Sequence, residues 1–123
     1  MTNSQLLFDA ARALLCFTFV IPGIQKIRQF GNYIGDLESK NIPLPRVSLI
    51  IVIFIELFGG LCILSGYLLE TSAVVLFLFL IPTTLIYHKF WGLDVTDKET
   101  QMVHFLKNLG IMAALLLIIM QTI

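Results

Sequence analysis

The sequence predicts an all-α membrane protein, an antiparallel bundle of four transmembrane helices with a short interfacial amphipathic helix between helices 1 and 2. Three observations predict this fold class. Of the 123 residues, 58% are hydrophobic and 13% are charged, whereas soluble domains carry about 25% charged residues. The hydrophobic residues gather in four runs, near the ~20 residues that cross a bilayer. The longest segment between these runs has the spacing of an amphipathic helix.

The four runs define the expected helices within one transmembrane domain over residues 1–123. Pro22 and Gly23 are expected to end the first helix. The turn between the second and third helices is expected at Glu70 and Thr71. A turn this short requires the two helices to be antiparallel neighbours. Residues Thr96–Glu99 form a capping box. The last helix is therefore expected to start near Asp97, the second residue of this box. The expected helices cover residues 6–24, 47–69, 71–91 and 98–122.

The segment between the first two helices contains an apolar stripe. Phe30, Tyr33, Ile34 and Leu37 recur at i, i+3, i+4 and i+7, the pattern of one helix face. We expect this helix to lie in the membrane interface. Basic residues are concentrated in this segment and in the third connection, on one side of the membrane. The positive-inside rule then places both termini outside the cytoplasm.

Ionisable residues inside the apolar runs indicate where the bundle interior lies, because each costs about 2.5 to 3.5 kcal/mol on insertion scales. Glu56 in the second run and Arg12 in the first have similar estimated depths. We expect these two residues to form an ion pair near the membrane centre. Asp9, three residues before Arg12, is the alternative partner.

A second polar cluster is expected near the membrane face that carries the long connection. Helix 1 ends there with Lys26, helix 3 ends there with His88 and Trp91, and helix 4 begins there with Lys107 and Asn108. The sequence therefore predicts one pocket lined by these side chains, partly closed by the amphipathic segment.

Each of these residues also has a purely structural interpretation. Glu56 could be only the counter-ion of Arg12, and Lys26 an ordinary interfacial lysine. Trp91 could be an aromatic-belt anchor, and His88 could merely mark a helix end. The convergence of several polar side chains at one depth favours a site.

Other classes of site lack support in the sequence. Eight basic and eight acidic residues leave no net charge to attract nucleic acid. The two histidines lack an obvious third ligand, so no metal site is predicted. No CxxC, haem or flavin signature is present, and Cys16 and Cys62 fall in apolar helices as buried hydrophobes.

At these positions the chain resembles the DoxX family of small four-helix membrane proteins. The matching pieces occur in order: Arg12-Ala-Leu-Leu, Gly23-Ile-Gln-Lys26-Ile, Ile42-Pro43, Glu56-Leu-Phe-Gly59-Gly60, Gly66-Tyr-Leu, His88-Lys-Phe-Trp91 and Phe105-Leu-Lys107-Asn108-Leu-Gly110. The resemblance implies a multi-pass protein of the bacterial plasma (inner) membrane. It carries seven residues over as family-pattern positions, and we predict that they are the ligand-binding residues: Arg12, Lys26, Glu56, His88, Trp91, Lys107 and Asn108. The family is tied to membrane redox processes, including a thiosulfate:quinone oxidoreductase subunit and a partner of secreted superoxide dismutase.

Two functions are therefore expected. The first is a redox-linked membrane subunit whose polar pocket binds a quinone or a small sulfur-containing or anionic ligand, working with partner redox proteins or as a homo-oligomer in the lipid bilayer. Stand-alone catalysis is not expected, because redox chemistry needs a cofactor. The second is a non-enzymatic membrane scaffold or carrier of a lipid or small metabolite.

Overall fold

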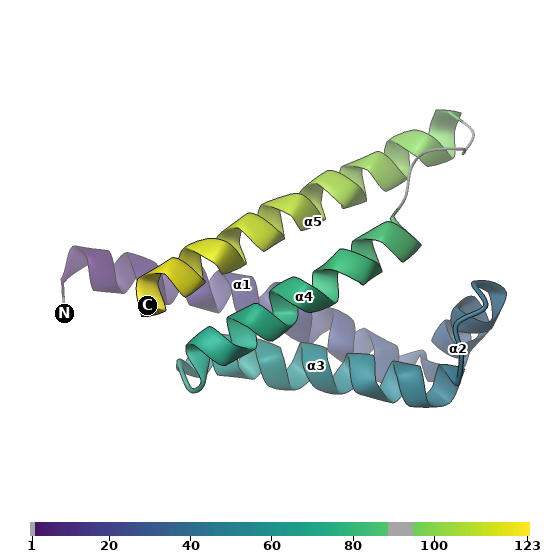
Figure 1. The fold of residues 1–123 in the computed structure, drawn as a ribbon, viewed down its shortest axis with the longest axis horizontal. Coiled ribbons are helices and arrows are strands. Elements are labelled where there is room, and N and C mark those ends of the chain that lie inside the picture. Colours follow the sequence, from purple (N-terminus) through teal and green to yellow (C-terminus); the bar gives the residue numbers. More distant parts are fainter. Residues whose placement is uncertain (1, 89–94) are drawn as a thin grey trace. The chain divides into compact units, whose positions relative to one another are not determined.

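The computed structural model describes residues 2–88 and 95–123, which form five α-helices and no strand (Figure 1). Four of the helices are long and apolar enough to cross a membrane, and the short α2 lies between the first two of them. The predicted fold class is therefore confirmed. The helices are α1 (Asn3–Arg28), α2 (Phe30–Ser39), α3 (Pro45–Ser65), α4 (Leu69–Tyr87) and α5 (Val95–Thr122).

The described helices fall into two compact units. The first unit, Met1–Leu68, contains α1, α2 and α3. The second unit, Leu69–Ile123, contains α4 and α5. Each unit has its own packed apolar core, so each is described by itself.

Helix α1 is longer than expected. The Thr2 side-chain oxygen accepts a hydrogen bond from the Gln5 backbone N–H at 3.1 Å, which caps its first turn. The helix then continues through Pro22 to Arg28, so the expected end at residue 24 is wrong. Membrane helices tolerate an internal proline because neighbouring groups can satisfy the freed carbonyl. As a result, Lys26 lies within the helix instead of in a loop.

The turn after α3 also differs from the expected one. The helix ends at Ser65, and Gly66 follows it in the left-handed conformation, with φ at 82°. Its N–H donates to the Cys62 carbonyl at 2.9 Å, as glycines do when they end helices. Glu70 is in the first turn of α4, so the turn predicted at Glu70 and Thr71 is wrong.

Two further helix bounds differ from the sequence prediction. Helix α4 ends at Tyr87 instead of residue 91, and residues 89–91 of that prediction lie outside the described residues. Helix α5 begins at Val95 instead of residue 98.

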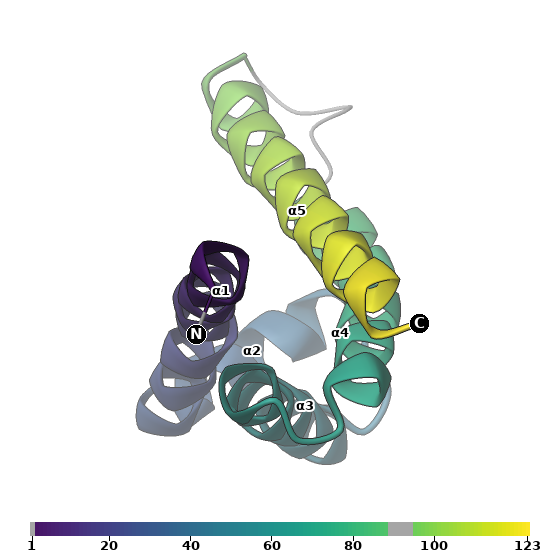
Figure 2. The same cartoon turned by 90° about the vertical axis from the view of Figure 1, so that its left-hand side faces the viewer.

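The first unit is built on the antiparallel pair α1 and α3, which lie side by side in Figures 1 and 2. Gly60 lets the two helices approach closely. A Cβ atom at this position would lie 2.8 Å from Val20 Cγ2 and 3.3 Å from the Cys16 carbonyl oxygen. Small residues at helix contacts serve this purpose in membranes. The other buried apolar side chains of the pair are Leu15, Cys16, Phe19, Leu49, Cys62 and Ile63.

Helix α2 packs on α3 and α1 through the predicted apolar stripe. Ile34 and Leu37 are buried, while Phe30 and Tyr33 are half-buried. The amphipathic interpretation of this segment is confirmed. Pro45 follows in the first turn of α3, where its missing N–H removes no helical hydrogen bond.

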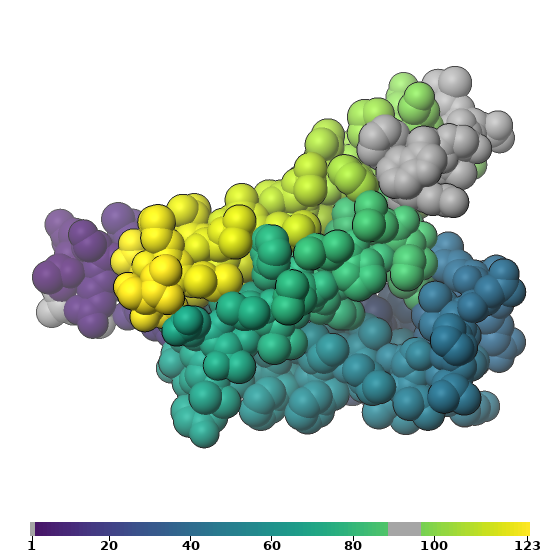
Figure 3. All heavy atoms as spheres, viewed as in Figure 1, coloured from purple at the N-terminus to yellow at the C-terminus, as the bar shows by residue number. Residues whose placement is uncertain are grey.

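The second unit is the pair α4 and α5, which pack against each other and are drawn as spheres in Figure 3. Leu76 and Leu115 are fully buried in it. Around them lie the other buried apolar side chains of the unit, Ala73, Leu80 and Ile118. Many large apolar side chains elsewhere remain exposed, such as Leu14, Phe54 and Leu117. That exposure suits helices surrounded by lipid tails, which are as apolar as leucine.

Both termini are expected on the same side of the membrane, because four helices of span length give an even number of crossings. Reporters of membrane sidedness, fused in turn to the N-terminus and the C-terminus, should give the same location. The distribution of basic residues predicts the side away from the cytoplasm. Opposite locations would contradict four crossings.

Candidate functional site

A buried ion pair joins the two long helices of the first unit. Lys26 Nζ of α1 lies 2.8 Å from Glu56 Oε1 of α3, with side chains 19% and 6% exposed. At this distance the ammonium and the carboxylate form a charge-assisted contact that holds α1 against α3. A carboxylate has several lone pairs, so Glu56 can accept a further hydrogen bond beside this contact.

Helix α2 contributes an aromatic ring to the same place. Lys26 Nζ lies 5.3 Å from the centre of the Tyr33 ring, a cation–π distance. Side chains from three helices thus meet here: Lys26, Tyr33 and Glu56, which we call the Lys26–Glu56 site. This contact places the amphipathic segment beside Lys26.

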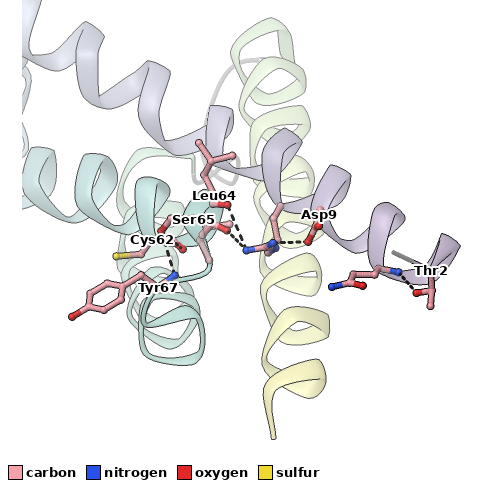
Figure 4. A network of polar contacts seen from close by, with 9 residues as sticks. Thr2, Asp9, Cys62, Leu64, Ser65 and Tyr67 are labelled. Atoms are coloured by element: carbon pink, nitrogen blue, oxygen red, sulfur yellow. Dashed lines mark hydrogen bonds and ion pairs between the residues drawn. The ribbon is translucent and has the colours of Figure 1, made fainter.

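Arg12 does not pair with Glu56, so that predicted contact is wrong. Its Nη2 atom lies 2.5 Å from Asp9 Oδ1 on the same helix. Its Nη1 atom donates to the backbone carbonyls of Ile63 and Leu64, at 3.3 and 3.5 Å. Figure 4 draws the contacts that reach Asp9 and Leu64.

The offset between α1 and α3 explains this result. The depth estimate assumed that both helices start from one plane at the long connection. In the structure, Lys26 near the end of α1 meets Glu56 in the middle of α3, and Arg12 meets the last turn of α3. That last turn contains no basic residue of its own, so the Arg12 cation stabilises its negative dipole end.

A separate polar group joins the two helices of the second unit. His88 Nδ1 lies 3.0 Å from Gln101 Oε1, and the rings of His88 and His104 lie 5.2 Å apart at their centres. We call His88, Gln101 and His104 the histidine cluster. One turn further into the unit, Asn108 Nδ2 donates to the buried Thr84 hydroxyl at 3.0 Å.

The residues of the predicted pocket belong to both units. Lys26 lies in the first unit, and His88 and Asn108 lie in the second, where the structure brings both into contacts between α4 and α5. Lys107 is exposed on α5. Trp91 lies outside the described residues.

Sequence reasoning missed Gln101, His104 and Thr84 as contributors to a polar contact. A signal for them was present. Thr84 and His88 are four residues apart on one helix, and His104 and Asn108 are four apart on the next. Residues four apart lie on the same face of a helix, so in an antiparallel pair both of them can contact the neighbouring helix. The prediction rested on ionisable residues inside the apolar runs, whereas Gln101 and His104 precede the last run and Thr84 is uncharged.

Comparison with known proteins gives consistent matches. The sequence profile of the DoxX family matches residues 7–89. The Inner membrane protein YphA of Escherichia coli K12 is 27% identical over 108 residues, which cover 88% of this chain and 77% of that protein. The Inner membrane protein YqjF of the same organism is 31% identical over 108 residues, covering 88% and 78%. No solved structure matches the chain.

Proposed function

The chain belongs to the DoxX family, and from that membership we propose that it is a redox-linked subunit that binds a quinone headgroup at the Lys26–Glu56 site. It is a multi-pass protein of the bacterial inner membrane. The observation that carries the proposal is a buried carboxylate, Glu56, which lies 2.8 Å from the partly exposed Lys26 ammonium. Quinones are lipid-soluble and carry polar groups that such a pair can bind.

The chemistry of the pair matches both redox states of a quinone. The Lys26 ammonium can donate a hydrogen bond to a quinone carbonyl, and the Glu56 carboxylate can accept one from a quinol hydroxyl. The Tyr33 ring beside Lys26 offers an aromatic surface for a quinone ring. Both hydrogen bonds involve a charged group, which makes them stronger than neutral ones.

Charge balance favours a quinone over a small sulfur oxyanion. A buried anion is stabilised by unpaired positive charge. In the first unit, Arg12 is paired with Asp9 and Lys26 is paired with Glu56. A neutral site stabilises a neutral headgroup without separating these pairs, whereas an anion must compete with the carboxylate for Lys26. A partner redox protein supplies electrons to a bound quinone or accepts them from a bound quinol.

The scaffold role remains the second candidate, and the Arg12 contacts favour it. One guanidinium joins Asp9 on α1 to the carbonyls of Ile63 and Leu64 on α3. Gly66 makes room for it, because a Cβ atom there would lie 2.7 Å from Nη1. This arrangement holds the two helices together through contacts that need no ligand.

The two candidates differ in quinone binding, which a charge-balanced double variant tests. Lys26→Met with Glu56→Gln removes both hydrogen-bonding charges but leaves no unpaired charge. We expect a short-chain ubiquinone or menaquinone analogue to bind the wild-type protein in detergent, and the double variant to bind it about 10- to 100-fold more weakly. That range corresponds to about 1.5 to 3 kcal/mol for a charge-assisted hydrogen bond.

Lys107→Met is the matched control, because it removes an exposed lysine from α5. It should bind the analogue like the wild type. Weaker binding by Lys107→Met with normal binding by the double variant would move the ligand to the second unit. Absence of binding by the wild-type protein to either analogue would leave the scaffold role.

A further inference from the structure

The histidine cluster combines two imidazoles with an orienting amide at the end of the second unit. His88 directly follows α4, and His104 lies on α5. They are the two histidines of the whole chain. Their ring centres lie 5.2 Å apart with planes tilted by 37°. Two imidazoles that share one tetrahedral metal ion, each bonded at about 2.0 Å, have ring centres about 5 Å apart.

Gln101 determines which nitrogen of His88 is available. Its side-chain oxygen lies 3.0 Å from His88 Nδ1, so it accepts a hydrogen bond from the protonated Nδ1. A neutral imidazole with its proton on Nδ1 has an unshared electron pair on Nε2. Metal-binding histidines are typically held this way, with the second nitrogen donating to an oxygen that fixes the ring.

The surroundings suit a cation that arrives from water. His104 is exposed and His88 is half-buried, so the cluster is accessible. The positive end of the helix dipole acts most strongly in the first turn of α5. His104 lies beyond that turn. The exposed carboxylates Asp97 and Glu99 precede it on the same helix, along with the exposed Lys98.

We propose that His88 and His104 together bind a divalent transition-metal ion that prefers imidazole ligands, with water completing its coordination. Among the described residues, no group of three or more His, Cys, Asp or Glu side chains is placed to hold a metal. The site therefore has two histidine ligands. Such a site binds the divalent first-row ions with affinities that follow the Irving–Williams order. Cu²⁺ binds most tightly in that order, so it is the probe of choice.

The experiment titrates Cu²⁺ into the full-length protein in detergent, purified with a tag that contains no histidine. Pulsed electron paramagnetic resonance detects the remote nitrogen of each coordinated imidazole. We expect one Cu²⁺ per chain with two imidazoles in the wild-type spectrum. A spectrum with no imidazole, or with one, overturns the shared site, and this measurement needs no variant.

Variants then test each residue. His104→Gln should lose the two-imidazole signal and most of the affinity, while unchanged binding would overturn the proposal. Gln101→Leu should weaken Cu²⁺ binding about 10- to 100-fold, as loss of an orienting partner does. Gln121→Leu makes the same change at an exposed position near the end of α5 and should bind like the wild type. Equal affinities of the two glutamine variants would exclude the orienting role of Gln101.

Discussion

Replacing Lys26 with methionine is expected to lower the free energy of unfolding by about 3 to 5 kcal/mol, the usual cost of removing one partner of a buried ion pair. The Glu56 side chain is 6% exposed and lies in the middle of α3. It cannot reach water, so the loss of Lys26 leaves its charge buried and unpaired. Methionine keeps most of the apolar stem of lysine, so the packing changes little. Unfolding in mixed micelles with increasing sodium dodecyl sulfate measures the difference.

The reverse change, Glu56→Gln, is expected to cost less. Lys26 lies in the last turn of α1, and a lysine near a helix end can extend its ammonium group to the membrane interface. The double variant should be less destabilised than the sum of the single variants, because neither charge is then left alone.

Lys107→Met provides the control for this series. It makes the same replacement at an exposed lysine, where changes usually stay within about 0.5 kcal/mol. A loss in Lys26→Met no larger than in this control would show that the ion pair contributes nothing to stability. Additive losses in the double variant would show that Lys26 and Glu56 do not interact.

Composition and hydrophobic run length were enough to predict the helices that span the membrane, because the bilayer imposes both. The apolar stripe from Phe30 to Leu37 likewise predicted α2. The helix ends were harder to predict from the sequence. Pro22 was interpreted as a terminator by the rule for soluble helices, and the left-handed Gly66 fell inside a helix that was expected to run to residue 69.

The polar residues of the membrane helices were predicted, and Asp9 was the expected alternative partner of Arg12, but the partner of Glu56 was not predicted. Which acid meets which base depends on the offset between α1 and α3, and a sequence period carries no information about that offset. The offset follows from close packing at Gly60 and from the position of α2 against α3. With this offset, Glu56 meets Lys26 and Arg12 meets the end of α3.

Gly60→Ala is the second large expected effect, a loss of about 1 to 3 kcal/mol, the usual cost of overpacking a core. The added methyl would lie 2.8 Å from Val20 Cγ2 and 3.3 Å from the Cys16 carbonyl oxygen. Valine is β-branched and has little freedom to rotate away, and the carbonyl belongs to the backbone of α1. The two helices must therefore move apart. The same detergent unfolding measurement reports the loss.

Two other helix glycines make the comparison specific. Gly23→Ala should cost less than Gly60→Ala, because its closest contacts are Leu57 side-chain atoms at 2.8 and 2.9 Å, and leucine can change rotamer. Gly110→Ala meets nothing within 4 Å and should be neutral or stabilising by about 0.5 to 1 kcal/mol, since alanine favours a helix over glycine. Helix propensity alone predicts stabilisation at all three positions, so only packing between α1 and α3 can order them. Equal effects at Gly60 and Gly110 would mean that the close approach of α1 and α3 at Gly60 does not exist in the membrane.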